Sequence, residues 1–209
     1  LYVLWDHQNA FLCANTLTLD TNVCGTTTAR AAEPVHGPPL QRLRERAAQR
    51  QGFRPPLWTY DVESDEDFLQ LMENIRAGID DAVDRVLTCA PDHLVMGMSS
   101  ETFWGGVKTS VELRDRMERR SGLAVTMGSD ASAAALRCYG DIKRIGVVTP
   151  YWPSGDEMVR RYFEESGLEV VRLKGLKSKS PMLISHVTGD QLQEALIELD
   201  GPDVDAIIQ

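Results

Sequence analysis

The feature that most constrains the fold is a regular alternation, from residue 64 onward, of short apolar runs with segments whose apolar residues recur at helical spacing. The apolar runs predict strands at 93–96, 123–126, 144–149, 168–173 and 204–208. The other segments predict helices at 64–88, 107–120, 131–139, 156–166 and 189–199. Strands separated by helices of about 10 to 20 residues pair in parallel through right-handed crossovers, so the predicted fold class is α/β.

The first 56 residues carry a weaker pattern. Residues 2–5 form an apolar run that fits a first strand, whereas residues 16–36 are rich in Thr, Asn and Ala and show little periodicity. The basic segment 42–54 fits an exposed helix whose charges face water. This part of the chain is therefore left poorly defined.

Charge and hydropathy exclude several classes of partner. The chain has 31 acidic and 22 basic side chains, for a formal net charge of −9, which disfavours binding to nucleic acid or to an anionic membrane. It has no apolar run of about 18 residues that could span a bilayer, and its first residues lack the basic region and apolar run of a signal peptide. We therefore expect a cytoplasmic protein with no membrane and no nucleic-acid partner.

Motifs for cofactor and metal chemistry are missing. The sequence contains no phosphate-binding G-x-x-x-x-G-K-[ST] loop, no G-x-G-x-x-G after a strand and no G-x-S-x-G elbow. The cysteines show no C-x-x-C spacing, and the histidines are scattered without the spacing of metal ligands. The sequence motifs therefore give no support for a nucleotide, dinucleotide or metal site, although a metal site remains open at this point.

Two loops follow predicted strands, at the sheet edge where ligands collect in open parallel sheets. In the first, residues 97–106, Gly97 permits a tight turn, and Ser99 and Ser100 leave room for an anion to meet N–H and hydroxyl donors. A helix N-cap at Ser99 or Ser100 is an equally good interpretation.

The second loop covers residues 149–156. The hydroxyl of Tyr151 could donate to a substrate oxygen there, or the ring could simply pack in the core. The position of Asp156 favours an N-cap of the following helix over a catalytic acid.

Three segments together resemble the arylmalonate decarboxylase and maleate isomerase branch of the aspartate/glutamate racemase superfamily. Residues 94–100, Leu-Val-Met-Gly-Met-Ser-Ser, resemble the first active-site loop of that branch. Residues 146–151, Gly-Val-Val-Thr-Pro-Tyr, with the helix and strand at 162–170, are similar to the start of its second half. Residues 203–208 are similar to the strand that leads to its C-terminal catalytic cysteine.

The resemblance implies two pseudo-symmetric α/β lobes, each a parallel sheet flanked by helices, with the active site in the cleft between them. Residues 1–125 would form the N-terminal lobe and residues 126–209 the C-terminal lobe. It also implies chemistry without metal or cofactor. Racemases and maleate isomerases of this superfamily use two cysteines, whereas arylmalonate decarboxylases have glycine at the first of these positions, which matches Gly97.

The resemblance also implies site residues. Gly97, Met98, Ser99 and Ser100 would hold a carboxylate and the enediolate formed from it, and Tyr151, preceded by Pro150, would donate its hydroxyl to the same group. Asn15 is similar to an asparagine of the first strand of the family. Two features depart from the pattern: Met98 replaces a small hydroxylic residue, and the asparagine typical of maleate isomerases is missing near residues 180–182.

The cysteine that would reprotonate the substrate is expected a few residues past Gln209. Because residue 1 is Leu and the sequence stops in an apolar run, we expect a fragment of a longer chain. The predicted function is a cofactor-independent decarboxylase of small substituted malonates, with a small dicarboxylate as its substrate. Maleate cis-trans isomerase or a racemase of the aspartate/glutamate type is the alternative enzyme, and a non-catalytic carboxylate-binding protein is the second alternative.

Overall fold

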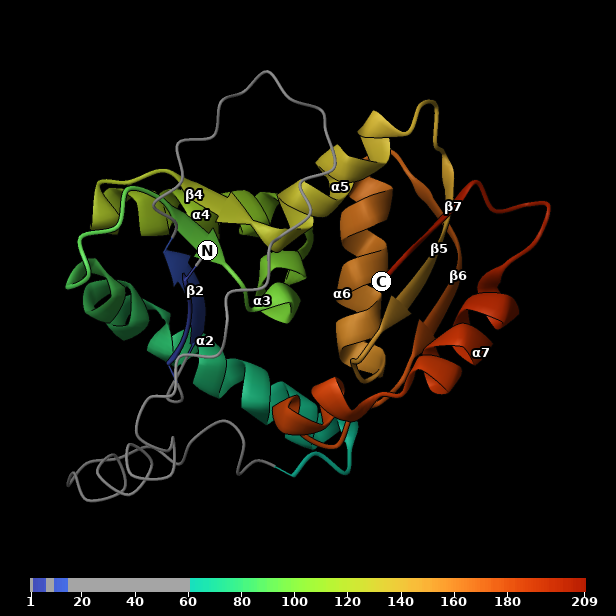
Figure 1. Cartoon of the computed structure of the whole chain (residues 1–209), viewed down its shortest axis with the longest axis horizontal. Helices are drawn as coiled ribbons and strands as arrows, with labels where there is room; N and C mark the ends of the chain where they lie inside the picture. Colours follow the sequence, from blue (N-terminus) through green and yellow to red (C-terminus); the bar gives the residue numbers. More distant parts are fainter. Residues whose placement is uncertain (1, 7–9, 15–60) are drawn as a thin grey trace. The chain divides into compact units, whose positions relative to one another are not determined.

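The computed structural model describes residues 2–6, 10–14 and 61–209, which belong to one compact unit (Figure 1). In chain order its elements are β1 (Tyr2–Asp6), β2 (Ala10–Ala14), α2 (Asp65–Leu87), β3 (Leu94–Met96), α3 (Ser99–Phe103), α4 (Gly106–Ser121), β4 (Val125–Met127), α5 (Gly128–Cys138), β5 (Arg144–Thr149), α6 (Pro153–Glu165), β6 (Glu169–Gly175), the 3₁₀ helix η2 (Pro181–His186), α7 (Gly189–Leu199) and β7 (Ala206–Ile208).

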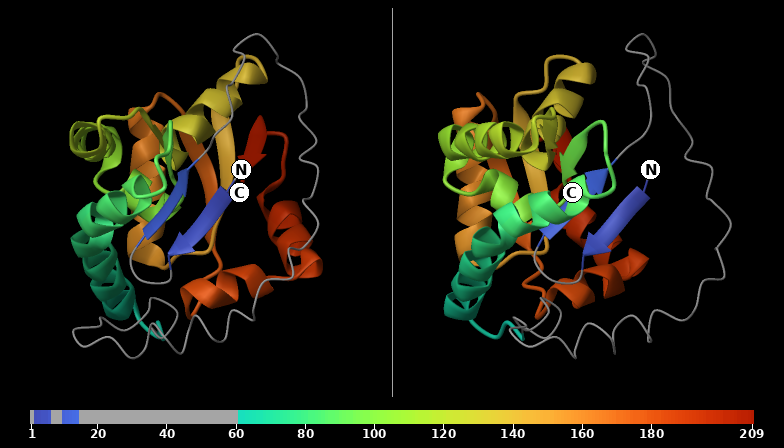
Figure 2. Two further views of the ribbon diagram at one scale, coloured as in Figure 1. Left: turned by 60° about the vertical axis from the view of Figure 1, so that its left-hand side comes forward. Right: turned by 90° about the vertical axis from the view of Figure 1, so that its left-hand side faces the viewer.

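The strands form two separate sheets. The first has the order β1-β2-β3-β4, and the second has the order β6-β5-β7. Parallel pairing joins β3 to β4 and holds the whole second sheet, which confirms the predicted α/β class. β1 and β2 pair antiparallel with each other, side by side in Figure 2, and β2 also pairs antiparallel with β3. The first sheet is therefore mixed, which the sequence did not predict.

Local capping residues set the ends of the longer helices. Ser64 and Asp67 form a reciprocal capping box at the start of α2, and Thr188 and Gln191 form another at the start of α7. The helix α4 ends at Gly122, whose φ of 71° is a left-handed conformation that glycine adopts without steric cost. The predicted helices at 64–88, 107–120 and 189–199 are confirmed to within two residues at each end.

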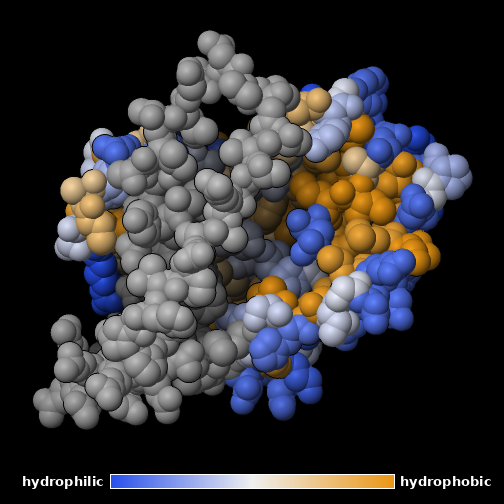
Figure 3. All heavy atoms as spheres, in the orientation of Figure 1, coloured by the Kyte–Doolittle hydropathy of each residue, from blue (hydrophilic) through white to orange (hydrophobic). Residues whose placement is uncertain are grey.

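Two helices cover opposite faces of the second sheet (Figure 1). Successive side chains of a strand point to opposite faces, so Val147 joins the main core with Phe163 of α6, while Val148 packs with Ala195 and Leu199 of α7. The cluster under α7 is small, and apolar residues around it remain partly exposed: Leu176, Leu192, Leu196 and Ile207. Figure 3 shows apolar surface over this part of the molecule.

Helix α6 corrects one sequence prediction. Its N-cap is Trp152, and Pro153 occupies the first helical position, so Asp156 lies inside the first turn and is not the N-cap. The reason is that proline, with a fixed φ and no N–H, fits the start of a helix and moves that start three residues toward the N-terminus. Helix α5 also starts earlier than predicted, at Gly128.

The predicted strand at 2–5 is confirmed as β1, whereas the predicted helix at 42–54 lies outside the described residues. The division into two lobes at 125 and 126 stays a prediction, and it would fall within β4. Within the described part of the chain, no helix has the length and apolar character needed to cross a membrane.

Candidate functional site

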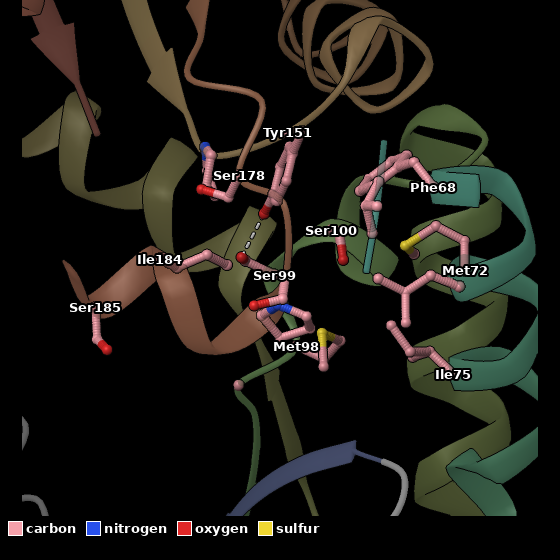
Figure 4. A pocket seen from close by; sticks show the side chains of 16 residues that line it. Phe68, Met72, Ile75, Met98, Ser99, Ser100, Tyr151, Ser178, Ile184 and Ser185 are labelled. Carbon is pink, nitrogen blue, oxygen red and sulfur yellow. Dashed lines mark hydrogen bonds between the residues drawn. The ribbon is translucent and has the colours of Figure 1, made fainter. Parts of the chain in front are cut away.

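The two predicted loops meet in the structure. Ser99, just after β3, and Tyr151, just after β5, lie with their hydroxyl oxygens 2.5 Å apart and share a hydrogen bond (Figure 4). These residues are 52 positions apart in the sequence, and their meeting follows from two strands that both end at this place. We call this pair the hydroxyl pair.

The loop after β3 is held by hydrogen bonds of α3. Met98 precedes the helix and has no side-chain cap, so the N-cap interpretation of Ser99 and Ser100 is wrong. Thr102, which is fully buried, donates its hydroxyl to the Ser99 carbonyl at 2.7 Å and accepts the N–H of Ser129 at 3.1 Å. The Ser99 backbone is thus fixed, and its side chain is free to face Tyr151.

Tyr151 is a buried hydroxyl donor. Its residue is only 7% exposed. Burial raises the pKa of Tyr151 to about 12, the nearby Asp156 also raises it, and the hydrogen bond that Tyr151 shares with Ser99 opposes the shift. The phenol therefore keeps its proton at neutral pH and can donate it to a substrate oxygen.

A cavity of about 470 Å³ opens beside the hydroxyl pair. This volume lies in the ordinary range for small-molecule sites. One wall is apolar and comes from α2 and from Val62, three residues before it. Figure 4 shows Phe68, Met72 and Ile75 facing the cavity. The apolar lining residues of this wall are Val62, Phe68, Leu71, Met72 and Ile75. The centre of the Phe68 ring lies 6.0 Å from that of the Tyr151 ring, so the apolar wall packs against the ring that carries one hydroxyl of the pair.

The polar side chains that line this cavity, among the described residues, are uncharged. It consists of hydroxyl groups from three places in the chain: Ser99, Ser100, Tyr151, Ser178, Ser180 and Ser185. Among the described residues that line the cavity, none is Lys, Arg, His, Asp or Glu. A carboxylate bound here would be held by neutral donors, in surroundings that are partly apolar.

A second cavity, of about 270 Å³, shares Ser99 and Tyr151 with the first. It is also lined by Ser132, by Ile208, which is the last residue of β7, and by Gln209, which follows it. Since β7 is parallel to β5, its C-terminal end lies at the same edge of the sheet as Tyr151.

An ion pair between a buried carboxylate and a partly exposed arginine supports the first loop. The Glu101 side chain in α3 is 5% exposed, and it accepts hydrogen bonds from the Arg76 guanidinium at 2.7 and 3.3 Å. Burial raises the pKa of Glu101, and the hydrogen bond and charge of Arg76 oppose that shift. Arg76 also lies over the Trp104 ring, 5.4 Å from its centre. The pair ties α3 to α2, the helix that supplies the apolar wall.

Most of the residues predicted from the sequence come together at the larger cavity. Gly97, Met98, Ser99, Ser100, Pro150 and Tyr151 all line it, while Asn15 lies outside the described residues. Their roles in binding or catalysis stay predictions. Sequence reasoning missed the apolar wall and the serines of residues 178–185. The amphipathic pattern of α2 marks a buried face but does not show that part of that face borders a cavity.

Other candidates lie elsewhere. Cys89 and Cys138 are exposed and line neither cavity. Trp152 donates its indole N–H to the Ser178 carbonyl at 3.1 Å, and Trp104 packs on Phe68. In the described part of the chain, no group of three or more His, Cys, Asp or Glu residues is arranged to hold a metal ion.

Comparisons with solved structures support this fold. The chain is 21% identical to the maleate cis-trans isomerase of Nocardia farcinica, with a TM-score of 0.63 over 71% of this chain and 61% of that one. A maleate isomerase from Pseudomonas putida S16 is 19% identical, with a TM-score of 0.61 over 66% of this chain and 58% of that one. A structure of arylmalonate decarboxylase is 20% identical, with a TM-score of 0.56 over 67% of this chain and 60% of that one.

The chain thus spans about 60% of the length of these solved structures. No curated protein matches it. The family model described as arylmalonate decarboxylase matches residues 59–208, which include both loops and every described element from α2 onward. The resemblance predicted from the sequence is therefore confirmed, and the chain belongs to the arylmalonate decarboxylase family.

Proposed function

We propose that the protein is a cofactor-independent decarboxylase of small substituted malonates. The observation that carries this proposal is the position of the apolar wall of α2 against the uncharged hydroxyl pair, in one cavity. A malonate with an apolar substituent matches both sides, because its substituent can contact Phe68, Met72 and Ile75 while one carboxylate meets the hydroxyls. Apolar surface removed from water in this way stabilises binding by about 25 cal/mol per Å².

The chemistry follows from the charge that develops. When one C–C bond breaks and CO₂ leaves, its electron pair passes into the remaining carboxylate to give an enediolate. That group carries more negative charge on its oxygens than the starting carboxylate. Donors such as the Tyr151 hydroxyl, whose pKa of about 12 keeps it protonated, would therefore stabilise the transition state more than the ground state.

A proton must then reach the α-carbon. The proposal assigns this step to a cysteine that follows Gln209, outside the 209 residues, whose thiol gives its proton to the carbanion and regains one from water. The position of β7 supports this assignment, because Ile208 and Gln209 line the smaller cavity beside the hydroxyl pair. In the described residues, neither cavity is lined by a cysteine.

Maleate isomerisation is the alternative activity, since solved maleate isomerases share the fold. Two features favour decarboxylation. Glycine stands at position 97, where the resemblance implies that isomerases carry a cysteine. Maleate is a small dianion with no apolar substituent, and the described lining of the cavity offers it no cation.

The test is a substituent series with the full-length protein, in which CO₂ release and product formation are followed by NMR. Phenylmalonate should have a KM about thirtyfold lower than that of methylmalonate, which corresponds to about 2 kcal/mol for burial of a phenyl-sized group. An α,α-disubstituted arylmalonate should give one enantiomer, because a fixed donor protonates one face. Binding without CO₂ release would identify a carboxylate-binding protein and refute the proposal.

A further inference from the structure

A chain of hydrogen bonds runs from the backbone of Tyr151 to Asp156, away from the cavity. The N–H of Tyr151 donates to the Thr149 hydroxyl oxygen at 3.1 Å. The Thr149 hydroxyl in turn donates a hydrogen bond to Oδ1 of Asp156. Thr149 is 3% exposed, so water does not compete for these bonds.

The other side of the same turn is held by the chain that follows β6. The carbonyl groups of Thr149, Pro150 and Tyr151 accept the N–H groups of residues 176, 178 and 177, at 2.8, 2.9 and 3.1 Å. These bonds hold the carbonyl side of the turn. The bond from the Tyr151 N–H to Thr149, which Asp156 supports, holds its amide side.

The neighbouring strand leaves room for this arrangement. Gly175 ends β6 beside Asp156, and a Cβ placed there would lie 2.9 Å from the Tyr151 carbonyl oxygen and would overlap the Asp156 carboxylate. Any larger residue at position 175 would displace the carboxylate from Thr149.

We propose that Asp156 is a positioning residue for Tyr151: acting through Thr149, its carboxylate fixes the backbone that aims the Tyr151 hydroxyl at Ser99 and at the substrate carboxylate. The inference rests on the proposed function for the role of Tyr151 as donor. The need for an acceptor at position 156 follows from the single proton of the Thr149 hydroxyl, which must be donated somewhere once its oxygen has accepted the Tyr151 N–H.

Charged groups from three parts of the chain face Asp156. Asp65, at the start of α2, accepts hydrogen bonds from the N–H and hydroxyl of Ser154, while Lys177 and Arg160 supply positive charge. Burial raises the pKa of Asp156 to about 6, Asp65 adds to the rise, and the Thr149 hydrogen bond and both cations oppose it. Asp156 is thus ionised at pH 8 and protonated below about pH 6, where it becomes a weaker acceptor.

The experiment compares three variants of the full-length protein in decarboxylation of phenylmalonate. Asp156→Ala and Thr149→Val each break the hydrogen-bond chain, and each should lower kcat by about 10- to 100-fold with a smaller change in KM. Asp156→Asn keeps an acceptor oxygen for Thr149, so it should retain most of kcat at pH 8 and should lose the fall in activity near pH 6. Asp190→Asn, in the exposed first turn of α7, is the matched control and should behave as the wild type.

Two results would overturn the inference. One is Asp156→Ala with kcat within twofold of the wild type at pH 8. The other is Asp156→Asn as impaired as Asp156→Ala, since that would show that charge and not the acceptor is needed. Thermal unfolding of each variant separates these effects from loss of the fold.

Failure of the proposed function would look different. If the wild-type protein releases no CO₂ from any arylmalonate, that function is wrong, and crystal structures of the variants still test Asp156. The Tyr151 hydroxyl should then leave Ser99 in Asp156→Ala and remain within hydrogen-bond distance in Asp156→Asn. A hydroxyl pair unchanged in Asp156→Ala would overturn the positioning role.

Discussion

Replacing Tyr151 with Phe removes one atom, the hydroxyl that lies 2.5 Å from Ser99 Oγ. The ring contact with Phe68 at 6.0 Å is kept, so the apolar side of the cavity should not change. The loss of one neutral hydrogen bond costs about 1 kcal/mol of stability. If the hydroxyl meets the developing enediolate, its removal should cost far more in the transition state, about 2.7–4 kcal/mol or 10²- to 10³-fold in kcat.

The assay is steady-state CO₂ release from phenylmalonate, with thermal unfolding measured on the same samples. Tyr139→Phe removes an exposed hydroxyl, on a residue that is 82% exposed, and serves as the matched control. Ser99→Ala and the double variant Ser99→Ala/Tyr151→Phe complete a double-mutant cycle. If the two donors are coupled, the fold-loss of kcat in the double variant should be smaller than the product of the two single fold-losses. A Tyr151→Phe enzyme with kcat within threefold of the wild type would refute the role of this hydroxyl.

Three further predictions concern the surroundings of the site. Gly155→Ala should lower stability by about 1–3 kcal/mol and reduce activity, because the new Cβ would lie 2.7 Å from the Phe68 ring. A melting temperature equal to that of the wild type would contradict this packing. In urea unfolding, Arg76→Ala should lower the free energy of unfolding by about 3 kcal/mol, near the low end for a broken buried ion pair because Arg76 is 40% exposed. Glu101→Gln should lower it less, because it leaves no unpaired buried charge, and the reverse order would be inconsistent with a buried Glu101 carboxylate. The pKa of Asp156 is about 6 in the folded state, against 3.8 for an unperturbed aspartate, so the native state binds the proton more tightly than the unfolded state. The contribution of Asp156 to stability should therefore fall as the pH rises from about 4 to 6. Urea unfolding at both pH values checks this slope, which should flatten in Asp156→Asn.

The sequence predicts the elements whose ends carry their own signals. For α7, Thr188 and Gln191 cap the start, and the predicted range 189–199 is the observed one. For α2, the capping residues and a long apolar face give a range within one residue of that observed. The strand β5 is a run of apolar residues that is buried along nearly its whole length, and its predicted bounds, 144–149, are those observed.

Other elements carry no such local signal. Helix α3 is five residues long and lacks a side-chain cap. It is held in place by hydrogen bonds of Thr102 and Glu101 to residues that are distant in the sequence. β2 owes its place to pairing with β1 and β3. Periodicity does not indicate such long-range contacts.

The candidate site divides in the same way. Gly97, Ser99 and Tyr151 follow predicted strands, and the rule that ligands collect at carboxyl ends of parallel strands was enough to select their loops. Phe68 and Ile75 could not be selected, because a cavity-facing residue and a core residue look alike on an amphipathic helix. Asp156 was assigned to the wrong role because the start of α6 depends on Pro153, three residues earlier.

The proposed function requires this cavity to remove a carboxylate from a malonate with an apolar substituent. The most direct measurement incubates the full-length protein with equal amounts of phenylmalonate and maleate and follows both by ¹H NMR, with Tyr151→Phe as the control. We predict that phenylacetate forms, with release of CO₂, that no fumarate forms, and that the rate falls at least a hundredfold in the control. Fumarate formed without phenylacetate would contradict it.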